Sequence, residues 1–288
     1  MPDDELPAED IWNFKVIGDK GFEMTGYPAI SNYHEFRYHP KEVITGVFDD
    51  WMYEHRGVFA WTTEIWSPQR QAGITDYKYI DWFRSHPHED DVKMLRWSDE
   101  KLGGKGYADW KAFDHPQLGK VEIGGWDREY AFRNPPKEYL EKEVTPLAEW
   151  VIWQAGLSPR LTIKEVRLDP AGETTRIRVV VENAGWLPTY VTKIGQKRKL
   201  CRGIVGEICR EGHQSGASEP DWLVSGNLRV EGGQLEGWSH VGDSASMSWG
   251  DLGNENRTVF EWVVRGSGNF DLSIAHERAG TVRRRVTI

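Results

Sequence analysis

The pattern of apolar and polar residues changes near residue 157. Before that point, segments with helical periodicity alternate with strand-like segments. Residues 48–54 predict a short helix that ends before Gly57, and residues 135–156 predict a longer helix that begins with prolines and ends with glycine. Residues 7–22 predict a first helix, whose apolar residues fall roughly on one face: Ile11, Trp12, Phe14, Val16 and Ile17.

Residues 58–66, VFAWTTEIW, are β-branched, aromatic and almost continuously apolar. Such a segment predicts a strand that is covered on both faces. Asp76 is expected to cap the next helix, which breaks near Pro87. A further helix then continues to the Gly103-Gly104 pair, and residues 120–127 predict a short strand or turn. We therefore expect helices and a mixed sheet in this first part.

After a short linker, apolar and polar residues alternate in short segments that turn residues separate. This pattern predicts an α/β unit over residues 1–157 followed by an all-β, immunoglobulin-like sandwich over residues 158–288. The arginine run at 283–285 is expected on an edge strand, where charge discourages aggregation. The strand-like segments are 161–168, 175–185, 198–209, 221–233, 257–266, 269–280 and 281–288.

Composition and charge limit the classes of partner. The 288-residue chain has a formal net charge of −9, which argues against nucleic-acid binding because that requires basic stripes. No apolar run approaches the roughly 20 residues needed to cross a bilayer, and the acidic start lacks the apolar region of a signal peptide. Cys201 and Cys209 could pair, but nothing requires it. The compartment stays open.

Glu64 is a charged residue near the end of the predicted strand. In open α/β sheets, ligands bind at the carboxyl ends of strands. An apolar surrounding destabilises an ionised carboxylate and makes it a better general base near neutral pH. The alternative is a solvated or salt-bridged strand-end glutamate, which is the commoner case.

Residues 46–64, GVFDDWMYEHRGVFAWTTE, resemble a motif of the funnelin zinc carboxypeptidases, the family of pancreatic carboxypeptidases A and B. Weaker similarity continues through residues 72–74, the Asp-His-Pro turn at 114–116, VEIGGWD and NPP. These segments look like a bacterial branch of the family with a C-terminal β-domain. The features that match with preserved spacing are Gly46, Asp50, Trp51, Tyr53, Gly57, Thr62 and Glu64.

The resemblance implies a role for three residues. Glu64 matches the general base that activates a zinc-bound water and later protonates the leaving amine. Asp49 falls on the floor of the specificity pocket, where an acidic residue implies a preference for a C-terminal Lys or Arg; the alternative is a helix-start cap. Tyr38 is the nearest match to the tyrosine that covers the substrate carboxylate, provided that the loop carries an insertion.

The family's zinc ligands, a His-x-x-Glu pair and a later His, lie upstream of the catalytic glutamate, and this chain has no match for them. The formal His-x-x-Glu at residues 86–89 follows Glu64 and contains proline, so we do not expect it to bind metal. The Gly-Gly-Lys-Gly run at 103–106 lacks the ending of a phosphate loop, and Ser244 and Ser246 lack a nucleophile elbow.

Two functional hypotheses follow. The first is a zinc-dependent metallocarboxypeptidase that acts on peptide or protein C-termini, present as a fragment without its zinc ligands and inactive alone. The second is a non-catalytic interaction protein built on the sandwich, with a vestigial peptidase half-domain. Because strands that would neighbour residues 58–66 are missing, we also expect self-association through an exposed sheet edge.

Overall fold

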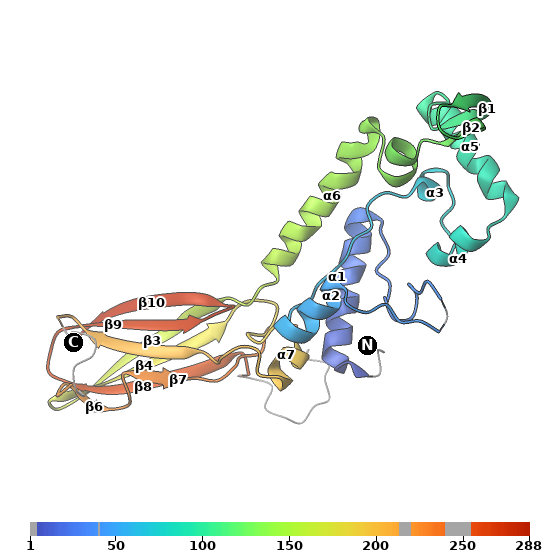
Figure 1. Cartoon of the computed structure of the whole chain (residues 1–288). Coiled ribbons are helices and arrows are strands. Elements are labelled where there is room, and N and C mark those ends of the chain that lie inside the picture. The colour runs from blue at the N-terminus through green and yellow to red at the C-terminus, as the bar shows by residue number, and fades with distance from the viewer. Residues whose placement is uncertain (1–4, 40, 213–219, 240–254) are drawn as a thin grey trace.

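The structure is a computed structural model that describes residues 5–39, 41–212, 220–239 and 255–288. The molecule is elongated (Figure 1): antiparallel sheets form one end, a small hairpin lies near the other, and long helices lie between them. We call the described residues before 158 the helical part and those after it the sandwich. This order, mixed helical and then β-rich, agrees with the sequence pattern. No helix in the described segments is long and apolar enough to cross a membrane.

Glycines end three helices of the helical part where the sequence predicts an end or close to it. Gly26, Gly57 and Gly103 each adopt a left-handed conformation, with φ of 71°, 60° and 59°. The expected Asp76 cap is wrong, because Lys78 precedes the helix and no side chain caps it. The elements are α1 Ala8–Thr25, α2 Phe48–Trp51, η2 Met52–Arg56, α3 Pro68–Gln71, α4 Tyr79–Arg84, α5 His88–Leu102, η3 Arg128–Arg133 and α6 Lys137–Gly156.

The buried face of α1 differs from the predicted one. Trp12 is 48 % exposed and stacks on Trp186 of the sandwich at 5.9 Å between ring centroids. Gly21 lies against α6, where an added Cβ would come within 2.8 Å of the Trp150 ring. The apolar residues of the sequence therefore predicted the wrong buried face, because most of the buried positions of α1 are polar residues or glycines. The buried residues are Asp10, Asn13, Ile17, Gly18 and Gly21.

The hairpin pairs β1 (Tyr107–His115) with β2 (Gly119–Trp126). The sequence pattern predicted β2 as a strand or turn but missed β1. Most residues of both strands are exposed, so apolar and polar residues do not alternate along them in the pattern that would predict a half-buried strand. It is the one sheet of the helical part as described, and the mixed sheet expected within residues 1–157 does not form there.

Two four-stranded antiparallel sheets form the sandwich, with orders β10-β9-β5-β7 and β3-β4-β8-β6. A short helix, α7 (Lys193–Lys197), lies between β4 and β5 in the chain. Each predicted strand-like segment overlaps at least one of these strands. Their bounds are β3 Leu161–Ala171, β4 Thr174–Asn183, β5 Val205–Arg210, β6 Leu223–Ser225, β7 Arg229–Glu231, β8 Arg257–Arg265, β9 Asn269–His276 and β10 Gly280–Thr287.

The core of the sandwich lies between the sheets, because strands of both contribute buried side chains. Ile177 and Val179 of β4 pair in register with Trp262 and Phe260 of β8, and the facing sheet adds Leu272 and other apolar residues. Strand alternation thus places one face inward and the other in solvent. As predicted, the arginine run 283–285 lies on an edge strand, β10. Cys201 and Cys209 do not form a disulfide with each other.

Candidate functional site

The site begins at residues 58–66, which form no strand in this structure. Figure 1 shows this segment leaving the end of the α2–η2 helix and running beside α1 toward α3. Among the described residues, none pairs with it in a sheet, so the predicted strand covered on both faces is wrong here. The sequence is strand-like, but a strand is only completed by a neighbouring strand.

Helices cover one side of the segment. Phe59 packs edge-on against Phe14 of α1 at 4.8 Å between centroids. Trp61 contacts Phe14 at 5.4 Å and Trp150 of α6 at 5.6 Å. Residues two apart in an extended chain share a face, so residues 59 and 61 face the helices and residues 60, 62 and 64 face away from them. Glu64 therefore belongs to the uncovered side.

Glu64 is exposed. The burial expected for this carboxylate is therefore wrong in this structure. An exposed carboxylate is instead accessible to a substrate.

Aromatic residues gather close to Glu64. The pKa of Tyr79 is raised, first by desolvation and then by the negative charges of Glu64 and its neighbours, while Arg133 acts in the opposite direction. Tyr38 also contributes to this shift, although 63 % of it is exposed. Phe36 connects the two tyrosines, at 5.6 Å from Tyr38 and 5.8 Å from Tyr79 between centroids.

Asp49 lies in the first turn of α2 and is partly buried. Val47 occupies the N-cap position and no side chain caps the helix, so Asp49 is not the expected cap. Asn32 Nδ2 donates to Asp49 Oδ2 at 2.6 Å. The second oxygen, Oδ1, is buried and has no hydrogen-bond partner among the described residues. A buried carboxylate oxygen without a partner is unfavourable and would gain from a cationic or donor group.

The far end of the segment is anchored by a buried polar network. Tyr27 Oη accepts from the Trp66 backbone N–H at 2.8 Å and donates to Glu143 Oε2 of α6 at 2.6 Å. Glu143 is 5 % exposed and also accepts from Arg70 at 2.8 Å and Gln71 at 3.0 Å. Burial and the bond to Glu143 raise the pKa of Tyr27 to about 12. Trp66 itself has a left-handed φ of 81°, which this network holds in place.

The near end is anchored by Asp10 of α1, which is fully buried. Its Oδ2 accepts from Tyr53 Oη, the aromatic residue of the motif, at 2.7 Å. The sequence analysis missed both Asp10 and Glu143. A signal existed for Glu143, because it precedes Leu147 and Trp150 by helical spacing and so falls on the buried stripe of α6. Nothing local marks Asp10, whose partners lie far along the chain.

The two histidines of the formal His-x-x-Glu, His86 and His88, both contact Asp91. His86 Nε2 lies 3.0 Å from Asp91 Oδ1 and the ring stacks on Trp82 at 4.0 Å, while His88 lies 3.4 Å from the same aspartate. The bond to Asp91 raises the pKa of His86. Within the described ranges, no group of three or more His, Cys, Asp or Glu side chains could hold a metal ion. Ser244 and Ser246 lie outside the described residues.

Comparisons with known proteins add one family match. A family model described as "Domain of unknown function (DUF8731)" matches residues 160–287, which is the sandwich. No curated protein matches the chain. Among solved structures, the chain is similar to an oxidised superoxide reductase, with 14 % identity, a TM-score of 0.22 and coverage of 45 % of this chain and 89 % of that one. It is also similar to β-glucosidase 3B from Thermotoga neapolitana in complex with α-D-glucose, with 10 % identity, a TM-score of 0.20 and coverage of 45 % and 16 %. Such low TM-scores carry no argument about function.

Proposed function

We propose that this chain is part of a zinc-dependent metallocarboxypeptidase in which Glu64 is the general base and the substrates are peptide or protein C-termini. The Gly46–Glu64 motif supports the reaction class. The observation that carries the assignment to Glu64 is that its carboxylate is exposed on a segment anchored at both ends, at Tyr53 and at Trp66. A base must be both accessible and held in position.

The residues described here do not fit a zinc site, because no cluster of metal-ligating side chains lies among them. The proposal therefore requires that the metal ligands come from residues outside this set, and that the described part alone is inactive. The steps assigned to this chain are limited to its own groups. Glu64 takes a proton from the attacking water and returns it to the nitrogen of the leaving amine when the peptide bond breaks.

Asp49 supports a preference for basic C-terminal residues. Its Oδ1 is buried and lacks a hydrogen-bond partner in the described structure, which is the condition that a substrate ammonium or guanidinium would relieve. Two ring contacts through Phe36 connect Tyr38 to Tyr79, and Tyr38 is exposed, which supports a role for it in covering a bound peptide.

The proposal extends to the fold. Residues 1–157 would be the C-terminal portion of a carboxypeptidase-like α/β domain, and the sandwich would be immunoglobulin-like. The unpaired segment at 58–66 supports the first, since a strand-like sequence lies where neighbouring strands would complete a sheet. Exposed apolar side chains of α6, including Leu140, Val144, Val151 and Ile152, support it as well.

The test uses the in-frame genomic sequence upstream of Met1. We expect this extension to supply a His-x-x-Glu pair, and the extended protein with zinc to release C-terminal Lys from a peptide. Glu64→Gln should lower kcat by a factor of about 10² or more, because it removes proton transfer but keeps the shape of the side chain. Glu89→Gln, at the formal His-x-x-Glu after the site, is the matched control and should retain activity. Turnover close to wild type in Glu64→Gln, or an upstream sequence without metal ligands, would overturn the proposal.

A second candidate function is a non-catalytic interaction protein built on the sandwich. The match of a family model to residues 160–287 favours it, because that match is confined to the sandwich. The same upstream sequence separates the two functions. A genuine start at Met1, with no extension, would favour the interaction protein.

A further inference from the structure

The sandwich contacts the motif-bearing turn through a buried carboxylate. Asp10 is fully buried, and its two oxygens accept hydrogen bonds from both sides of the contact. The backbone N–H groups of Lys193 and Ile194, at the start of α7, donate to Asp10 at 2.7 and 3.1 Å. Tyr53 Oη donates to the same carboxylate at 2.7 Å. One buried side chain of α1 thus joins the sandwich to η2.

Arg278, in the turn between β9 and β10, makes a second contact with the same turn. Its guanidinium donates to Gly57 O at 2.9 Å and to Tyr190 O at 2.8 Å. It also donates to Arg56 O. Three backbone carbonyls, two from the helical part and one from the sandwich, therefore share one planar donor group. Hydrogen bonds from a charged donor are stronger than those between neutral groups.

The backbones of the two parts also touch directly. Gly57 has a left-handed φ of 60°, and an added Cβ would lie 2.7 Å from Gly195 Cα of α7. Arg198 at the end of α7 donates to Glu54 O at 2.7 Å. Only glycine permits this approach, because any side chain at residue 57 would collide with the sandwich backbone.

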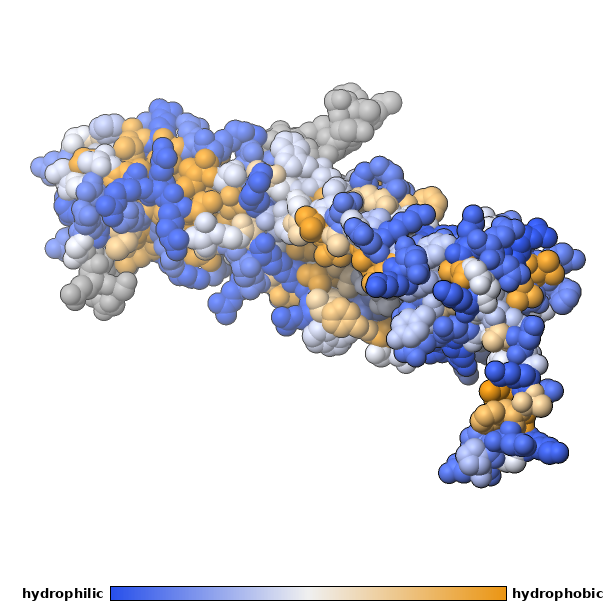
Figure 2. All heavy atoms as spheres, turned by 90° about the horizontal axis from the view of Figure 1, so that it is seen from above, coloured by the Kyte–Doolittle hydropathy of each residue, from blue (hydrophilic) through white to orange (hydrophobic). Residues whose placement is uncertain are grey.

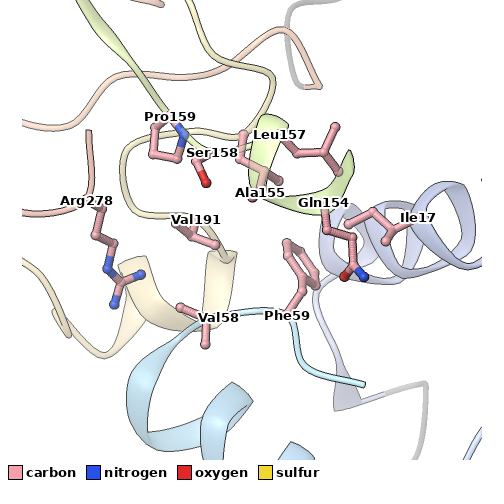
Figure 3. Close-up of a pocket in the computed structure, with 11 residues that line it drawn as sticks. Ile17, Val58, Phe59, Gln154, Ala155, Leu157, Ser158, Pro159, Val191 and Arg278 are labelled. Carbon is pink, nitrogen blue, oxygen red and sulfur yellow. The ribbon is translucent and has the colours of Figure 1, made fainter. Parts of the chain in front are cut away.

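Apolar packing around these contacts is incomplete. A cavity of about 430 Å³ lies at the junction (Figure 3), with Ile17, Val58 and Phe59 on one side and Leu187, Val191 and Arg278 on another. A junction that retains such a cavity is not held by close-packed side chains alone. The polar contacts at Asp10 and Arg278 therefore help to define the relative position of the two parts, together with the Trp12–Trp186 stack.

We propose that the sandwich is a positioning element for the Glu64 segment, and that Arg278 and Asp10 are its positioning residues. They fix the turn at residues 53–57, from which residues 58–64 extend, while Tyr27 and Glu143 fix the far end at Trp66. The role assigned to Glu64 rests on the proposed function, but the positioning of the segment does not. Without the sandwich, the turn at residues 53–57 would keep its bond to Asp10 but lose the contacts from Arg278 and Arg198.

The first test uses limited trypsin digestion of the full chain. Arg278 protects the Arg56–Gly57 bond, since it binds the carbonyl of that bond and Gly57 is buried. We expect Arg278→Ala to accelerate cleavage at this bond by about tenfold or more, measured by mass spectrometry, and Arg278→Lys to give an intermediate rate because one ammonium cannot serve three carbonyls. Arg285→Ala, which removes an exposed arginine bound to Asp271 at the far edge of β10, is the control. An unchanged rate in Arg278→Ala would overturn the proposal.

A second variant guards against misfolding. Asp10→Asn keeps the size of the side chain but replaces one acceptor oxygen with an NH2 group. It should therefore weaken the hydrogen bonds from the N–H groups of residues 193 and 194. Hydrogen exchange should then increase by about tenfold at the backbone amides of Lys193, Ile194 and Gly57, with the amides of β4 and β8 unchanged. Unaltered exchange at these three amides would also count against the positioning role.

Kinetic measurements on the Arg278 and Glu64 variants distinguish the positioning role from the proposed function. In the extended, zinc-loaded protein, Arg278→Ala should lower kcat about tenfold with KM nearly unchanged, and Arg278→Lys should restore part of it. Full activity in Glu64→Gln would end the proposed function and leave the digestion result standing. Activity that depends on Glu64 but not on Arg278 would end the positioning role alone.

Discussion

The two parts of the molecule differ in how completely they bury their apolar side chains. In the sandwich, alternating residues of both sheets form one continuous core, and the exposed large apolar residues among those described are Leu168, Val224, Trp238 and Val259. In the helical part, the second core cluster contains only Ile74, Trp82 and Met94 as buried members. Figure 2 shows apolar side chains at the surface over the middle of the molecule, where the helices lie, and also over the sandwich at the left end.

The difference teaches that the two parts reach stability in different ways. The sandwich buries its own apolar faces because each sheet covers the other. The helical part leaves one side of residues 58–66 and several positions of α6 uncovered, and it relies on polar anchors such as Asp10 and Glu143. A substitution in the apolar core should therefore destabilise the sandwich most, and a substitution at a polar anchor should destabilise the helical part most.

The largest effect is expected in the core of the sandwich. Trp262 is 1 % exposed and stacks on Phe260 at 6.0 Å between centroids. Trp262→Ala should lower the free energy of unfolding by about 3–5 kcal/mol, because a large cavity replaces the ring. Ile152→Ala in α6, where the side chain is 72 % exposed, is the control and should change it by less than about 0.5 kcal/mol. Urea unfolding measures both, and similar losses in the two variants would refute the contrast.

A smaller effect is expected at the polar anchor of the helical part. Glu143→Ala removes the acceptor for Tyr27, Arg70 and Gln71 and should cost about 2–3 kcal/mol, whereas the exposed Glu141→Ala should cost little. The pKa of Tyr27, about 12, should fall toward its ordinary value, because the bond that holds its proton is lost. Ultraviolet titration of tyrosine measures this shift.

The sign of the pH dependence follows from the same group. The folded state holds the Tyr27 proton up to a pKa of about 12, whereas the unfolded chain releases it near 10. The stability that this group contributes is present below pH 10 and is lost as the pH rises from 10 through 12. In Glu143→Ala that loss should be reduced, and an identical alkaline unfolding profile in the variant and the wild type would contradict the network.

Sequence patterns predicted the sandwich well because each strand carries its own local signal of alternation and turns. Helix ends were predictable for the same reason, since Gly57 and Gly103 act within one turn of their helices. The segment at 58–66 was not, because a strand depends on partners that lie elsewhere in the chain. Asp10 was missed because it binds backbone N–H groups of residues 193 and 194, and no local pattern records so distant a contact.

The candidate site was predictable only in its residues and not in its surroundings. The resemblance implied roles for Glu64, Asp49 and Tyr38, and in the structure Phe36 lies between Tyr38 and Tyr79. Among the described contacts, none joins Asp49 to Glu64. The burial expected for Glu64 failed because it assumed a complete sheet around residue 64, and that sheet is not formed by the described residues.

The smallest effect on stability, yet a clear effect on assembly, is expected at the unpaired segment itself. Between residues 59 and 65, no backbone group of the described structure makes a backbone hydrogen bond outside its own element, so the segment can pair with that of a second copy. We expect the chain alone to self-associate through this edge despite its net charge of −9, as detected by sedimentation velocity.

Thr62→Pro tests that edge directly. Proline lacks the N–H that a ladder needs, so it should block pairing and shift the chain to monomer. Thr62 is exposed and its backbone N–H makes no backbone hydrogen bond in the described structure, so the proline removes no such bond and should destabilise the fold less than Trp262→Ala. Thr62→Val, which keeps the N–H and favours strands, is the matched control and should associate at least as strongly as the wild type. A wild-type chain that sediments as a monomer would refute the self-association. A proline variant that still associates would show that the contact lies elsewhere, for example at the exposed side chains of α6.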